Sequence, residues 1–128
     1  MNDIKTAEKW VEFLASCADV PFRSTLREHF RAGRITRLCD CGCNSFDLEV
    51  PAGTLLPPLC PPSEHGGMFF EIVFESNDGR DVDFLLFADS RGYLLGIDVT
   101  SGESNEGPLP ADVRLGSVRY VLTDRSRG

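Results

Sequence analysis

The sequence lacks the features that mark most enzymes and membrane proteins. No stretch approaches the roughly 18 consecutive apolar residues that span a bilayer. Acids interrupt residues 1–20, so the continuous apolar run of a secretory signal is missing. There is no G-x-S-x-G, P-loop, G-x-G-x-x-G, H-E-x-x-H or C-x-x-C motif, and the chain has only two histidines. These absences predict a cytoplasmic protein with neither enzymatic activity nor a cofactor.

Positive charge is scarce in the middle of the chain. The net charge is −7, and residues 36–110 contain thirteen acids against three arginines. An acidic block repels nucleic acids and anionic membranes, which are themselves polyanions, and it attracts a basic protein partner. The alternative is that these acids only solvate one face of a sheet. The sequence is compatible with a homo-oligomer and does not determine the oligomeric state.

The apolar pattern predicts one domain over residues 1–128 that begins with two helices. A chain of 128 residues, 41% of them hydrophobic, can bury a sizeable core. Ile4, Ala7, Val11, Leu14 and Ala18 recur at spacings of three and four and form one apolar stripe, which predicts a helix over about 3–18. A proline at position 21 and a glycine at position 33 favour a second helix over 21–32.

From residue 35 the apolar period changes to two, which is typical of strands. Short connections rich in turn residues predict antiparallel neighbours. The sequence therefore predicts an α+β fold, with two N-terminal helices packed on one face of an antiparallel sheet of about five strands, within about 35–122. The predicted strands are 35–39, 46–50, 69–75, 82–88 and 93–99, with 113–122 as a further candidate. Residues 51–67, which hold five of the eight prolines, are predicted to be a surface loop.

Strand alternation predicts a sheet face, turned away from the helices, that mixes acids with apolar side chains. Such mixtures are typical of protein-binding surfaces. The residues predicted to lie on this face include Asp47, Glu49, Asp81 and Phe87. The candidate partner-binding residues are Glu71, Val73, Glu75, Asp83, Leu85 and Asp98.

The segment CDCGCNSFDLEV (39–50) raises the possibility of thiol chemistry. In an extended chain Cys39, Cys41 and Cys43 would share one side and could hold a soft metal ion. Cys60 or His65 could then supply a fourth ligand. A thiolate metal-binding or redox protein built on these cysteines is therefore the alternative hypothesis.

Two features weaken that alternative. C-x-C-x-C is not the C-x-x-C knuckle that structural zinc sites usually use. The neighbouring Asp40 and Asp47 would raise a thiol pKa, whereas a redox cysteine needs a lowered one. Packing as small apolar side chains is the favoured interpretation. For the histidines, we expect His29 to be packed and hydrogen-bonded in the core and His65 to be solvated.

Two segments together resemble an uncharacterised family of small bacterial proteins. These are CDCGCNSFDLEV (39–50), which fits C-x-C-G-C-x-S-x-D-[LF], and GYLLGIDV (92–99), which fits G-Y-L-x-x-[IL]-[DE]. The resemblance covers roughly residues 35–100. It implies a bacterial origin and a small α+β domain, and it implies no catalytic residue because that group has no established activity. The acidic sheet and small size are also similar in style to immunity proteins that neutralise toxins.

Overall fold

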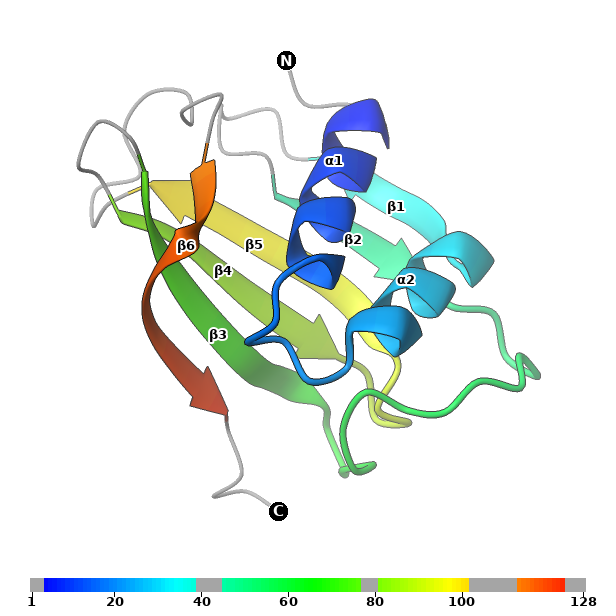
Figure 1. Ribbon diagram of the computed structural model, residues 1–128. Coiled ribbons are helices and arrows are strands. Elements are labelled where there is room, and N and C mark those ends of the chain that lie inside the picture. Colours follow the sequence, from blue (N-terminus) through cyan, green and yellow to red (C-terminus); the bar gives the residue numbers. More distant parts are fainter. Residues whose placement is uncertain (1–3, 39–44, 77–80, 102–112, 124–128) are drawn as a thin grey trace.

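The computed structural model describes residues 4–38, 45–76, 81–101 and 113–123. They contain two helices followed by six strands (Figure 1). The helices are α1 (Ile4–Ala15) and α2 (Arg23–Ala32). The strands are β1 (Arg34–Leu38), β2 (Phe46–Glu49), β3 (Gly67–Ser76), β4 (Asp81–Ala88), β5 (Leu94–Ser101) and β6 (Val113–Thr123). None of the described helices has the length and apolarity that crossing a membrane requires.

The six strands form one sheet in the order β1-β2-β5-β4-β3-β6, and every neighbouring pair is antiparallel. β3, β4 and β5 follow one another as a meander, while β2 pairs with the distant β5, with Phe46 opposite Ile97. The candidate strand 113–122 is β6, which pairs with the free side of β3. The predicted α+β class is therefore confirmed, with six strands where about five were expected.

Both helices lie on the same face of the sheet, as predicted (Figure 1). Aromatic rings join the two layers in edge-to-face contacts, with Trp10 5.3 Å from Phe84 and Phe13 4.8 Å from Phe74 between ring centroids. Nearer α2, the ring of Phe22 lies 5.0 Å from that of Phe70. Of these rings, Trp10, Phe70, Phe74 and Phe84 are fully buried, and the burial of each such side chain stabilises the fold by roughly 1.5–3 kcal/mol.

The helix boundaries differ from the prediction by a few residues. α1 ends at Ala15 rather than near residue 18, and α2 begins at Arg23 rather than at Pro21. The buried stripe of α1 also differs, because Trp10 belongs to it while Ile4, which was expected in it, is 55% exposed. The stripe is centred on the large indole, which carries more apolar surface than any neighbouring side chain.

α2 passes directly into β1 at Gly33, whose N–H donates to the His29 carbonyl at 2.9 Å. The φ of Gly33, −85°, is accessible to any residue, so backbone conformation does not require glycine here. A Cβ at this position would lie 2.6 Å from Leu48 Cδ2, so any larger residue would force the buried Leu48 side chain to shift. The glycine lets the end of α2 approach β2 closely.

Candidate functional site

The sheet face turned away from both helices is the predicted site, and we call it the outer face. In β4 the core residues alternate with Asp81, Asp83, Leu85 and Phe87, which are exposed or half-buried. The register brings like charges together, because Glu75 lies directly opposite Asp81. Carboxylates directly opposite one another on neighbouring strands destabilise a sheet. The register therefore gathers acids on neighbouring strands of the outer face.

Glu71 and Asp83 form the closest acidic contact of the outer face. They lie at diagonal positions of β3 and β4, and a hydrogen bond between two such carboxyl groups requires one proton. Burial, this hydrogen bond and repulsion from Glu71 and Asp81 raise the pKa of Asp83 to about 7. Asp83 Oδ1 is also buried without a hydrogen-bond partner among the described residues. The pair is thus partly protonated at neutral pH.

A second acidic contact lies nearer the β1 edge of the sheet. Partial burial and repulsion from Asp47 raise the pKa of Asp98, while Arg37 opposes this shift. Arg37 Nε donates to Asp47 Oδ2 at 2.9 Å. Asp98 lies opposite Leu85 in the register, so an apolar side chain separates it from the Glu71–Asp83 pair. The outer face therefore alternates acidic and apolar positions across several strands.

The structure places most of the six candidate partner-binding residues on this face at intermediate exposure. Glu71, Glu75, Asp83, Leu85 and Asp98 are all half-buried. Val73 differs, because it is only 3% exposed. The expectation that Val73 shares an accessible surface is therefore wrong. Strand alternation assigns a residue to a face, but it carries no information on what covers that face.

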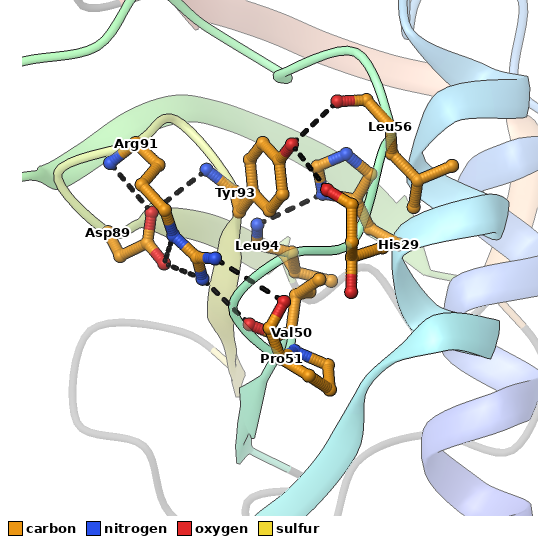
Figure 2. A network of polar contacts seen from close by, with 9 residues as sticks. His29, Val50, Pro51, Leu56, Asp89, Arg91, Tyr93 and Leu94 are labelled. Carbon is orange, nitrogen blue, oxygen red and sulfur yellow. Dashed lines mark hydrogen bonds and ion pairs between the residues drawn. The ribbon is translucent and has the colours of Figure 1, made fainter.

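A polar network that the sequence analysis missed lies at the turn between β4 and β5 (Figure 2). Asp89 Oδ1 accepts hydrogen bonds from the backbone N–H groups of Arg91 and Tyr93, at 2.9 and 3.1 Å. Its Oδ2 pairs with the Arg91 guanidinium, with Nη2 at 2.6 Å. Partial burial raises the pKa of Asp89, but these hydrogen bonds outweigh it and hold the pKa below its ordinary value.

The same network holds the proline-rich loop against the sheet. Arg91 Nη2 donates to the Val50 carbonyl at 2.7 Å, and the Tyr93 hydroxyl lies 2.8 Å from the Leu56 carbonyl (Figure 2). His29 Nε2 reaches the Pro57 carbonyl at 2.7 Å. His29 is 0% exposed, which confirms that it is a core histidine. Since Arg91, Tyr93 and His29 each bind a backbone carbonyl of the segment 50–57, the network fixes this segment against the sheet.

The sequence signal for this network was weak. DSRG (89–92) indicated only a hairpin turn, and nothing local shows that Arg91 reaches residues forty positions away. An aspartate side chain that accepts a hydrogen bond from the backbone two residues later, as Asp89 does, is common in turns of every kind. Only the closure of the proline-rich loop over the turn brings the partners together.

The structure describes only some of the residues proposed for a metal or redox site. Cys39, Cys41 and Cys43 lie outside the described residues. Cys60 is a half-buried free thiol whose pKa is raised by burial and by the negative charge of Asp89. His65 is solvated, as expected, with a side chain 87% exposed. The described part of the chain contains no group of three or more His, Cys, Asp or Glu side chains that could hold a metal ion.

Comparison with known proteins gives no relative from which a function could be transferred. No family model, no curated protein and no solved structure matches the chain.

Proposed function

We propose that the protein is a bacterial, cytosolic, non-enzymatic interaction module that binds a basic protein partner through the outer face. Its action would resemble that of an immunity protein, which neutralises a toxin by binding it. The partner would meet Glu71, Glu75, Asp83, Leu85 and Asp98, with Val73 beneath them.

The observation that carries this proposal is the placement of Glu71 and Asp83, two half-buried acids at diagonal positions of β3 and β4 whose mutual repulsion helps to raise the pKa of Asp83. Two carboxyl groups in such a site keep a proton because both cannot ionise without strong repulsion. A lysine or arginine side chain from a partner would replace that proton and neutralise both carboxylates. Binding would then relieve a repulsion that the free protein carries.

The apolar members of the outer face supply the other part of the argument. Leu85 and Phe87 lie on the same face as the acids and are half-buried. A partner that covered them would remove apolar surface from water at about 25 cal/mol per Å². Charge would guide the encounter, and burial of these side chains would slow dissociation.

The test compares two charge-matched double variants. Glu71→Gln/Asp83→Asn removes two acids from the outer face, and Asp19→Asn/Glu64→Gln removes two exposed acids elsewhere. A protein captured from extracts by the wild type is purified, and its association and dissociation are measured against all three forms. We expect a basic protein whose affinity falls at least about tenfold with the outer-face variant only. Its association rate should fall as salt rises, because ions screen the steering charges.

The pH dependence of partner affinity is a second, independent measurement, because it reports on the proton held by Glu71 and Asp83. Because the free pair holds a proton up to about pH 7, cation binding should release it, and affinity should rise between pH 6 and pH 8. The outer-face variant should lose this pH dependence. Equal affinity for both double variants, or an acidic captured partner, would overturn the proposal.

A further inference from the structure

A groove lies on the opposite side of the molecule, between α1, α2 and the edge strand β1. Its volume is about 750 Å³, within the range of small-molecule sites. The apolar part of its lining comes from Ile4, Phe30, Ile35 and Leu48. Leu48 is buried, Phe30 and Ile35 are half-buried, and Ile4 is 55% exposed at the first turn of α1. The exposed Ile4 side chain extends the apolar lining of the groove out to solvent.

Charged side chains complete the lining of the groove. Arg27 and Glu12 neutralise each other in a bidentate pair, with Nη2 2.8 Å from Oε1 and Nε 2.9 Å from Oε2. Glu8 is the other acid of the lining, against Arg31 and Arg34. The lining therefore carries one excess positive charge in a chain whose net charge is −7.

The two remaining arginines are available to a ligand. The side chains of Arg31 and Arg34 are exposed and donate no hydrogen bond to another residue of the described chain, although the charge of Arg31 helps to lower the pKa of Glu12. Glu49 lies opposite Arg34 in the β1–β2 register without an ion pair. An arginine offers five N–H donors in a planar fork that suits carboxylate or phosphate oxygens.

We propose that this groove binds a small amphipathic anion, an aliphatic chain that ends in a carboxylate or a phosphate. The chain would lie along Ile4, Phe30 and Ile35, and the anionic head would meet Arg31 and Arg34. This site is separate from the outer face and would function whether or not a basic partner binds there.

Two observations favour a small molecule over a peptide. A strand could add to the open edge of β1, but the register of β1 is interrupted between Ile35 and Arg37, and such irregularities protect an edge from pairing. A docked helix is about 10 Å wide or more with its side chains. Two turns of such a helix would fill or exceed the volume of this groove, whereas an aliphatic chain of eight to twelve carbons needs far less.

The test titrates the ¹⁵N-labelled full chain with octanoate and with octyl phosphate below micelle formation. We expect saturable shifts centred on Ile4, Phe30, Arg31 and Ile35. Ile4→Glu should weaken octanoate binding at least about tenfold, since it removes the apolar rim and adds a negative charge. The helix should tolerate this change, because an acid in the first turn favours the helix dipole. Leu55→Glu, at a loop position 95% exposed, is the matched control and should leave binding unchanged.

The contribution of the head group is tested separately. Arg31→Gln should weaken octanoate binding but leave the weaker binding of 1-octanol unchanged, while Arg23→Gln, on the same helix, should affect neither. Octylamine should bind more weakly than octanoate. Equal binding of octylamine, or the same octanoate affinity in Ile4→Glu and Arg31→Gln as in the wild type, would overturn the proposal. Binding to phosphatidylglycerol vesicles without binding of free octanoate would also overturn it, in favour of a lipid-surface contact.

Discussion

The backbone N–H of Leu94 donates a hydrogen bond to Nδ1 of His29 at 3.2 Å, across 65 residues of sequence. An amide N–H can only donate, so Nδ1 is the acceptor and the imidazole proton lies on Nε2. That proton is donated to the Pro57 carbonyl at 2.7 Å. One neutral tautomer of a fully buried ring therefore joins α2, the start of β5 and the proline-rich loop. Protonation of Nδ1 would break the contact with Leu94.

This relationship predicts how stability depends on pH. Burial lowers the pKa of His29, so the folded state binds fewer protons than the unfolded state near pH 6. The stability that His29 contributes is present above its ordinary pKa and is lost as the pH falls below it. We expect His29→Gln to cost about 1 kcal/mol at pH 8. Its deficit relative to the wild type should shrink towards pH 5, measured by urea unfolding.

His65→Gln is the control for this measurement, because the His65 side chain is 87% exposed. It should leave the free energy of unfolding unchanged at every pH. A deficit of His29→Gln that is constant from pH 8 to pH 5 would contradict the assignment of a neutral, hydrogen-bonded ring.

Asp83 predicts the opposite dependence on pH. Its folded pKa of about 7 lies above the ordinary value of 3.8, so the folded state binds more protons between these values. The stability it contributes is present at low pH and is lost as the pH rises through 7. Asp83→Asn does not titrate, so its stability relative to the wild type should increase from pH 4 to pH 8. We expect a gain of about 1 kcal/mol, because the side chain is partly solvated and screened.

Glu64→Gln provides the comparison for Asp83→Asn in the same unfolding experiment. It removes one negative charge from an exposed loop position and should show no such trend. If both variants gained stability equally with pH, the effect would come from net charge and not from the Glu71–Asp83 pair.

The fold class could be predicted because periodicity reports directly on which side chains are buried. Phe70, Ile72 and Phe74 alternate with Glu71 and Glu75 in the sequence, and the structure buries the first three. The order of the strands could not be predicted, because the alternation of buried and exposed residues in one strand does not depend on which strand is its neighbour. The pairing of β2 with β5 depends on contacts between residues some fifty positions apart.

The candidate site was likewise predictable only in part. Alternation correctly assigned Asp83 and Leu85 to one face, but it could not show that Val73 is covered. It also could not show that Glu71 lies close enough to Asp83 to share a proton, because these residues are diagonal neighbours on different strands. The groove was missed for a related reason, since Ile4 was assigned to the buried stripe of α1.

Tyr93 predicts how firmly the proline-rich loop is held. Its hydroxyl lies 2.8 Å from the Leu56 carbonyl and 3.1 Å from that of Thr54. Tyr93→Phe removes this donor and should cost about 1 kcal/mol of stability. The amide of Leu59, which donates to the Gly92 carbonyl, should then exchange faster with deuterium. The Leu26 amide in α2 should keep its rate of exchange, and acceleration of both amides would indicate global rather than local opening.

Alanine substitutions at Gly92, in the β4–β5 turn, and at Gly53, in the proline-rich loop, separate the cost of backbone strain from the cost of a steric clash between turn and loop. Both have positive φ, 87° and 89°, so alanine at either position is strained by roughly 1–2 kcal/mol. They differ in space, because a Cβ at Gly92 would overlap the carbonyl oxygen of Cys60, whereas nothing lies within 4 Å of one at Gly53. Gly92→Ala should therefore be the more destabilising by about 1–3 kcal/mol in urea unfolding. Equal losses would mean that the loop can move away from the turn, and that the hydrogen bonds of Arg91, Tyr93 and His29 do not hold it in place.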